Sequence, residues 1–147
     1  MDRIFQLEFS RGGKFFAKLL DEEAPETSQK FWESLPFEGK IFHGSFNGFT
    51  VGFYVEFKVG KVENPFVTGM QAGDLFLNTY ANKLLFKGKP LKEEIYLPYY
   101  QGGMFWNYGG AAPCNRFARV QENLDKLYRI GRRIHEEGSE IIHLSKL

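Results

Sequence analysis

Residues 25–49 read PETSQKFWESLPFEGKIFHGSFNGF and place a helix signal directly ahead of a strand signal. Three acidic residues lie just ahead of Pro25, and a proline suits the first helical turn because the N–H that it lacks would be unpaired there. Thr27, Phe31 and Leu35 are spaced four apart, so they share one helix face, and a second proline then interrupts the pattern. The stretch predicts a helix from Pro25 to Leu35 that leads into a strand.

Alternating apolar residues predict strands on both sides of this helix, because every second side chain of a strand points to the same face. The expected strands in the first part of the chain are residues 3–9, 15–20, 40–46 and 49–59. Asn47-Gly48 is a typical two-residue turn between the last two of them. The side chains expected to face the interior are Phe5, Leu7, Phe9, Phe49, Val51, Phe53, Val55 and Phe57.

The second half of the chain mixes short strands with turn-rich segments and ends on a helix and a strand. The expected elements are a loop at 61–73, strands at 74–80 and 83–86, an aromatic loop at 88–113, a strand at 117–120, a helix at 122–137 and a strand at 140–144. The helix is predicted from side chains at helical spacing, which are Leu124, Leu127, Tyr128, Gly131, Ile134 and His135.

Composition indicates one β-rich domain over residues 1–147. The chain is long enough to bury a core, and aromatic residues make up 17% of it, which favours pleated sheets. A net charge of +1 gives no basis for attracting nucleic acid or an anionic membrane. The lone Cys114 excludes an intrachain disulfide and fits a reducing compartment. The N-terminus lacks the apolar run of a signal peptide, so we expect a cytoplasmic protein.

The stretch APETSQKFWESLPFEGKIFHGSFNGF resembles the N-terminal pattern of cyclophilins, in which a Pro-x-Thr helix leads to a Phe-His strand and a Gly-Phe pair. The rest of the chain, including GMQAGDLFL, PCNRFARVQENLDKL and EEGSEIIHL, is more similar to a microbial cyclophilin-like family catalogued as domain-of-unknown-function family 3830. This resemblance implies a closed β-barrel capped by two α-helices, with no established activity. It agrees with the mainly β pattern of strands and two helices expected from the residues.

Two positions that carry catalysis in cyclophilins are glycines in this chain. In those prolyl isomerases an arginine follows the Phe-His pair and a glutamine lies eight residues further along, and the matching positions here are Gly44 and Gly52. Neither glycine can donate a hydrogen bond from a side chain, so the electrostatic stabilisation of the transition state is missing. We therefore expect no prolyl isomerase activity. The two glycines also remove bulk, which predicts an opening beside His43.

His43 is the most suggestive single residue, because imidazole can donate, accept or ligate near neutral pH. A hydrogen-bonded structural histidine is the alternative interpretation. His135 and His143 show no spacing that links them to His43 in a metal site, and no motif indicates a cofactor. Cys114 could act as a nucleophile with a base in reach, but a small inert thiol is the favoured interpretation.

Polar and aromatic side chains further along the chain complete the candidate site. Asn115 and Arg116 could present an amide and a bidentate fork to a carboxylate, or could serve the structure alone. The aromatic loop has flat rings with polar tips, which suit a small-molecule or peptide pocket, or else a subunit interface. The candidate ligand-binding residues are His43, Tyr99, Tyr100, Trp106, Asn107, Tyr108, Asn115 and Arg116.

Three kinds of function stay open on the sequence. The favoured hypothesis is binding of a small organic or short peptide-like ligand in a pocket at the barrel mouth. The second is a small-molecule hydrolase or isomerase with His43 as general base and Arg116 as anion anchor. The third is an assembly module, in which the aromatic loop contacts a second copy of the chain to give a homo-oligomer.

Overall fold

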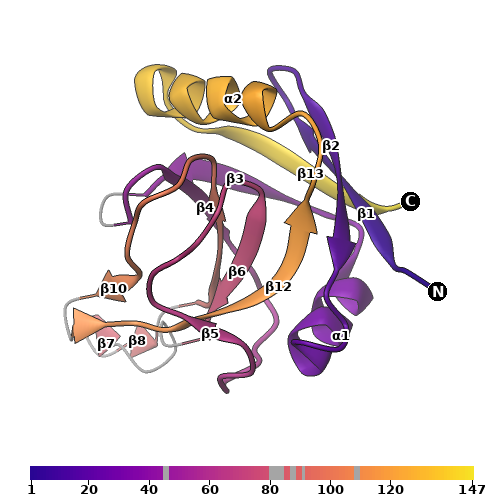
Figure 1. The fold of residues 1–147 in the computed structure, drawn as a ribbon, viewed down its shortest axis with the longest axis vertical. Coiled ribbons are helices and arrows are strands. Elements are labelled where there is room, and N and C mark those ends of the chain that lie inside the picture. The colour runs from indigo at the N-terminus through magenta and orange to yellow at the C-terminus, as the bar shows by residue number, and fades with distance from the viewer. Residues whose placement is uncertain (45–46, 80–84, 87–88, 91, 108–109) are drawn as a thin grey trace.

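A closed barrel of eight antiparallel strands forms the body of the protein (Figure 1). The computed structural model describes residues 1–44, 47–79, 85–86, 89–90, 92–107 and 110–147, with the backbone alone at residues 85–86, 89–90, 107 and 110. The barrel strands are β1 (Ile4–Phe9), β2 (Lys14–Leu19), β3 (Phe37–His43), β4 (Thr50–Tyr54), β6 (Asp74–Asn78), β9 (Glu94–Pro98), β12 (Cys114–Val120) and β13 (Glu140–Lys146). Their order is β2-β1-β13-β3-β4-β9-β6-β12, and the pairing of β2 with β12 closes the ring.

The remaining elements lie around this barrel. They are α1 (Pro25–Ser34), α2 (Leu124–Glu137), β5 (Pro65–Phe66), which pairs with β12, and the hairpins β7 (Leu85–Phe86) with β8 (Lys89–Pro90) and β10 (Trp106–Asn107) with β11 (Gly110–Ala111). Helix α2 lies across one end of the barrel, and the short hairpins lie at the other (Figure 1). Neither helix of the described residues has the length and apolar character needed to cross a bilayer. The predicted mainly β architecture with two helices is confirmed.

Alternate strand side chains fill the barrel interior, as the sequence pattern predicts. The row on β1, formed by Phe5, Leu7 and Phe9, is at most 2% exposed. On β4, Val51 and Phe53 are fully buried. Because rings and branched side chains dominate these rows, the core is packed without any disulfide.

Phe49 is the exception in the predicted interior row. β4 begins at Thr50, so Phe49 belongs to the connection from β3, where 37% of its surface is exposed. The chain turns at Gly48, whose φ of 75° lies in the region that glycine adopts without strain. The predicted two-residue turn at Asn47-Gly48 is therefore wrong, because β3 ends at His43 and β4 begins only at Thr50.

Strand β9 lies inside residues 88–113, which the sequence indicated as a loop. It pairs with β4 on one side and β6 on the other, so it is a central strand of the barrel wall. Ile95 and Leu97 on this strand are fully buried. The flanking Pro90 and Pro98 obscured the short apolar alternation, although Pro98 is compatible with a strand because it stands at its end.

Helix α1 is held at its start by Glu63, which comes from a distant segment. The Glu63 carboxylate accepts hydrogen bonds from the backbone N–H groups of Glu26 at 2.9 Å and Thr27 at 2.7 Å. It also accepts the Thr27 hydroxyl at 2.6 Å. Since Ala24 at the N-cap position has no side-chain acceptor, Glu63 supplies both the acceptors and the negative charge that a helix start needs. The predicted helix is confirmed, and its Phe31 is fully buried.

Helix α2 covers its end of the barrel with one apolar face. The buried side chains on this face are Leu127, Ile130, Gly131 and Ile134. The prediction that His135 belongs to the buried face is wrong, because its ring lies at the edge of that face against the ring of His43, with 4.6 Å between centroids. His135 is exposed.

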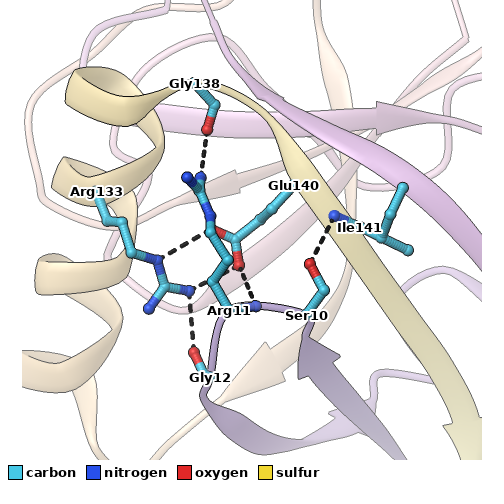
Figure 2. Close-up of polar contacts among 7 residues, drawn as sticks. All are labelled: Ser10, Arg11, Gly12, Arg133, Gly138, Glu140 and Ile141. Carbon is cyan, nitrogen blue, oxygen red and sulfur yellow. Dashed lines mark hydrogen bonds and ion pairs between the residues drawn. The ribbon is translucent and has the colours of Figure 1, made fainter.

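Figure 2 shows how the C-terminal end of α2 is joined to the β1–β2 hairpin. The carboxylate of Glu140, which is 1% exposed, accepts Nε of Arg11 at 2.9 Å and Nε and Nη2 of Arg133 at 3.0 and 2.7 Å. Arg11 also donates to the carbonyl of Gly138, and Arg133 to that of Gly12. Burial raises the pKa of Glu140, but the hydrogen bonds from the two arginines outweigh this effect and hold it below its ordinary value.

Candidate functional site

His43 stands at the end of β3 and is hydrogen-bonded on both ring nitrogens. Nδ1 donates to the carbonyl of Gly44 at 2.9 Å, so Nε2 accepts the hydroxyl of Tyr99, at 2.7 Å. The ring of His135 lies edge-on to it, with 4.6 Å between ring centroids. Burial lowers the pKa of His43, the hydrogen bond to Gly44 opposes this, and the charges of His135 and Arg132 lower it further. The neutral imidazole with its proton on Nδ1 satisfies all of these contacts.

Tyr99 follows β9 and joins the barrel wall to α2. Only 1% of its surface is exposed, and its ring lies directly on Gly131, where an added Cβ would stand 2.2 Å from the ring. Burial raises the pKa of Tyr99, and a hydrogen bond from Arg132 to its hydroxyl lowers the pKa part of the way back. With His43 on one side and α2 on the other, the ring of Tyr99 is held in one position.

Three partly exposed rings surround Tyr99, and together the four are named the aromatic cluster: Phe49, Tyr99, Tyr100 and Tyr128. Phe49 contacts Tyr99 and Tyr100 with centroid distances of 5.8 and 5.4 Å. Tyr128 of α2 contacts the same two tyrosines at 5.7 and 5.6 Å. The cluster therefore spans the seam between α2 and the barrel wall, with its outer rings open to solvent.

An open pocket of about 420 Å³ lies along this seam, and we name it the α2 pocket. Its lining residues are Ala72, Tyr99, Tyr100, Leu124, Asp125, Tyr128 and Arg129. The volume is within the usual range of small-molecule sites. Three tyrosines contribute to the wall, and Asp125 and Arg129 place one charge of each sign at the side of α2. The arrangement can hold a flat apolar group and orient it by a polar contact.

The expected opening at Gly52 is filled by Tyr96. These two residues stand opposite each other on β4 and β9, and an added Cβ at Gly52 would lie 2.9 Å from both the Tyr96 ring and the carbonyl of Ile95. Tyr96 in turn stacks on Phe105 with 5.5 Å between centroids. This outer face of the barrel wall is therefore covered, and the prediction of free space at this glycine is wrong.

Asn115 and Arg116 lie on β12, which is four strands from β3 in either direction around the barrel. Both ends of the Asn115 amide are used inside the chain, where Oδ1 accepts the N–H of Glu63 and Nδ2 donates to the carbonyl of Lys61, each at 2.8 Å. Arg116 pairs with Glu23 at 3.0 Å, and its buried Nε has no hydrogen-bond partner among the described residues. The structure thus places the histidine of β3 and the proposed anion anchor on opposite sides of the barrel.

Two further predicted residues, Trp106 and Asn107, lie at the barrel end away from α2 (Figure 1). Trp106 and Asn107 form β10, and Trp106 is 48% exposed. The side chain of Asn107 and the whole of Tyr108 lie outside the described residues. The predicted residues that the structure brings together are His43, Tyr99 and Tyr100.

Residues of α2 that the sequence reasoning did not propose belong to the same seam. Tyr128 and Arg129 line the α2 pocket, and Arg132 reaches the hydroxyl of Tyr99. A signal was present, because Asp125, Tyr128, Arg129 and Arg132 follow the spacing i, i+3, i+4 and i+7 of one helix face. Arginines in the second half of a helix also complement the negative end of its dipole, and this ordinary role hid their position beside the aromatic rings.

Cys114 is fully buried, which supports its interpretation as an inert thiol. Its Sγ donates to the carbonyl of Ala112 at 3.3 Å. Burial raises the pKa of the Cys114 thiol well above its ordinary value, so little reactive thiolate forms at neutral pH. In the described part of the chain, no three His, Cys, Asp or Glu side chains gather to hold a metal ion.

The arrangement of strands and helices defines a cyclophilin-like β-barrel, and similar solved structures agree. A cyclophilin-type peptidyl-prolyl cis-trans isomerase from Cryptosporidium parvum has a TM-score of 0.57 and 12% identity, with 100% of this chain and 98% of that chain covered. The hypothetical protein AF2241 from Archaeoglobus fulgidus has a TM-score of 0.62 and 18% identity, with 99% and 95% covered. At these identities the likeness is one of fold.

A larger protein shares the fold as well. The structure of McbB in complex with tryptophan has a TM-score of 0.68 and 17% identity over 96% of this chain. The match covers 44% of the McbB chain, so this chain spans less than half the length of McbB.

The chain belongs to the family described as protein of unknown function DUF3830, whose sequence model matches residues 8–146. The resemblance read from the sequence is therefore confirmed. No curated protein matches the chain.

Proposed function

We propose that this protein binds a small organic or peptide-like ligand through a flat aromatic or apolar group that enters the α2 pocket. The observation that carries the proposal is the pocket itself, in which partly exposed Tyr100 and Tyr128 stand over a buried floor formed by Tyr99. Exposed rings that line a concave site are typical of ligand recognition, because they have large apolar faces and polar tips.

The fixed position of Tyr99 supports this role. Its hydroxyl is held by His43, and its ring lies against Gly131, so the floor of the pocket does not have to be ordered when a ligand arrives. A site that is already ordered loses less conformational entropy on binding, and the affinity rises accordingly. In this proposal His43 positions Tyr99 and does not touch the ligand.

Tryptophan is a suitable first probe. The similar structure of McbB contains tryptophan, an amino acid with a flat ring. The volume of the α2 pocket, about 420 Å³, accommodates a molecule of that size.

The proposal includes the absence of prolyl isomerase activity. Gly44 and Gly52 replace the hydrogen-bond donors of the isomerases, and Tyr96 occupies the space over Gly52. A glutamine at that position would therefore require Tyr96 to move. In a protease-coupled assay with a proline peptide we expect the uncatalysed rate, and turnover at a cyclophilin-like rate would overturn this part of the proposal.

The binding test compares two tyrosines of equal exposure. Tyr100 and Tyr54 are each 49% exposed, but only Tyr100 lines the α2 pocket. We would titrate the wild type, Tyr100→Ala and Tyr54→Ala with tryptophan, indole and a panel of small aromatic compounds, using NMR chemical shifts and thermal stabilisation as readouts. We expect saturable shifts at α2 and after β9, and a loss of about fivefold or more in affinity in Tyr100→Ala alone. If no compound shifts these signals, or if both variants lose equally, the proposed site is wrong.

A further inference from the structure

We infer that the ligand of the α2 pocket carries a carboxylate, which Arg129 and Arg132 bind while its apolar group lies against the wall formed by Tyr100 and Tyr128. This inference rests on the proposed function and adds the charge of the ligand to it. The evidence is the position of the two arginines on α2 and the way in which their donors are used.

Both guanidinium groups lie beside the aromatic cluster. Arg129 lines the α2 pocket, and Arg132 reaches the hydroxyl of Tyr99 at its floor. They are three residues apart on α2 and therefore lie on the same face of the helix. Tyr128, which precedes Arg129, contributes a ring to the same wall. A molecule with its ring on this wall would have its polar end beside Arg129, with Arg132 three residues further along the same helix face.

The ion pairs of these two arginines are long. Arg129 meets Asp125, and Arg132 meets Glu136, each at 3.4 Å between nitrogen and oxygen. Charge-assisted hydrogen bonds between nitrogen and oxygen are normally about 2.7–2.9 Å. Pairs between residues four apart on an exposed helix contribute only about 0.3–0.5 kcal/mol. A ligand can therefore displace or share these contacts with little loss.

Arg133, in the same helix, differs from Arg129 and Arg132 because it makes short hydrogen bonds to distant residues. Its contacts to Glu140 are 2.7 and 3.0 Å, and it also donates to the carbonyl of Gly12 at 2.9 Å. Figure 2 shows it turned toward the β1–β2 hairpin. The contrast indicates that Arg129 and Arg132 have donor capacity that the fold does not use.

A carboxylate fits these donors better than the other common polar groups. A guanidinium presents parallel N–H donors whose spacing matches the two oxygens of a carboxylate, and a neutral amide offers only one acceptor oxygen. The competing choice is a cationic ligand bound by Asp125. Its carboxylate is 79% exposed, whereas the side chain of Arg132 is 32% exposed. Electrostatic attraction is stronger where water is partly excluded, which favours the site at Arg132.

The test uses three probes that share one ring and differ in charge: 3-phenylpropionate, 3-phenylpropionamide and 3-phenylpropylamine. Dissociation constants would be measured by NMR titration at low and high salt. We expect the carboxylate to bind about tenfold more tightly than the amide, and the preference to shrink at high salt. The preference is expected to disappear in Arg129→Gln/Arg132→Gln. Lys126→Gln, which removes an exposed charge of the same sign from α2, is expected to keep it.

The outcomes separate this inference from the function on which it rests. If the carboxylate and the amide bind equally at the α2 pocket, the inference is overturned and the aromatic site stands. Tightest binding of the amine overturns it too, and assigns the polar contact to Asp125. If none of the three probes binds there, both the inference and the proposed function fail. Thermal unfolding of each variant confirms that loss of preference does not come from loss of the fold.

Discussion

Arg132 and Arg133 are neighbours in α2 and serve opposite purposes. Arg133 points toward the β1–β2 hairpin, where it shares a buried carboxylate with Arg11. Arg132 points toward the aromatic cluster, where its carboxylate partner is its own helix neighbour Glu136 at 3.4 Å. Two adjacent positions of α2 therefore carry an arginine whose donors hold the fold together and an arginine whose ion pair is long and exposed.

The contacts of the two arginines separate a structural charge from a binding charge without a bound ligand. A charge that holds the fold together has short contacts to groups far along the chain, as Arg133 has to Gly12. Arg132, by contrast, meets its carboxylate partner Glu136 only at 3.4 Å within its own helix, and its contact far along the chain is with the neutral hydroxyl of Tyr99. The two faces of α2 can thus be tested against each other by matched substitutions.

The largest effect is expected when the two neighbouring arginines are replaced in turn. Arg133→Gln removes one of the two arginines that neutralise the buried carboxylate of Glu140, and we expect a loss of about 2–3 kcal/mol in the free energy of unfolding. Arg132→Gln should change stability by less than about 0.5 kcal/mol. Urea unfolding of both variants measures the contrast, and equal losses would remove the distinction between the two faces.

The stability that Arg133 and Glu140 contribute together depends on pH. Because the folded-state pKa of Glu140 lies below its ordinary value of 4.5, its ionised form stabilises the fold above that pH, and this stabilisation is lost as the pH falls. The difference between wild type and Arg133→Gln should therefore shrink below about pH 4.5.

A somewhat smaller effect is expected from Gly131→Ala. The new Cβ would lie 2.2 Å from the ring of Tyr99, which cannot move without breaking its hydrogen bond to His43. Overpacking of this kind outweighs the gain of about 1 kcal/mol in helix propensity, so we expect a net loss of about 2 kcal/mol. In a Tyr99→Ala background the same change should become neutral or stabilising. If the loss persists there, the contact with Tyr99 is not its cause.

The next effect concerns the hydroxyl of Tyr99. Tyr99→Phe leaves Nε2 of His43 without its donor, and we expect a loss of about 1 kcal/mol in stability. Tyr128→Phe removes a hydroxyl from a ring that is 38% exposed, and should stay within about 0.5 kcal/mol of wild type. The two variants are compared by denaturant unfolding, and a loss that is no larger for Tyr99 would show that its hydroxyl does not fix the pocket floor.

The smallest effect is a pH dependence from His43. The folded-state pKa of His43 lies below the ordinary value of 6.5, so the unfolded chain takes up a proton at a higher pH than the folded chain does. Stability should therefore fall as the pH drops below about 6.5. His43→Gln should lack this component, whereas His143→Gln leaves the His43–Tyr99 pair in place and should keep it. Parallel pH slopes for wild type and His43→Gln would contradict this assignment.

Much of the fold could be predicted because its signals are local. The proline and the four-residue spacing of Thr27, Phe31 and Leu35 indicate α1, and alternation on β1 indicates its buried face. Strand β9 was missed because its five residues lie between turn signals, and its place depends on pairing with β4 and β6. Phe49 was misplaced for a related reason, since a shift in the start of a strand changes which side chains are buried.

The candidate site could be predicted only in part because it depends on the order of the strands. His43 and Tyr99 are 56 positions apart, and a hydrogen bond between them follows from their meeting under α2. Asn115 and Arg116 looked equally suitable as binding residues, but β12 lies across the barrel from β3. No local sequence pattern gives the distance between β3 and β12, because it depends on the order of all eight strands around the closed barrel.

The attachment of Glu63 to α1 has a consequence for the order in which the chain acquires structure. A helix of ten residues is marginal alone, and this one receives its first-turn acceptors from a residue 36 positions beyond Thr27. Glu63 is itself held by Asn115 of β12. Helix α1 should therefore complete its first turn late in folding, after β12 has joined the sheet, and its amide hydrogens should exchange with solvent in one unit with those of β12.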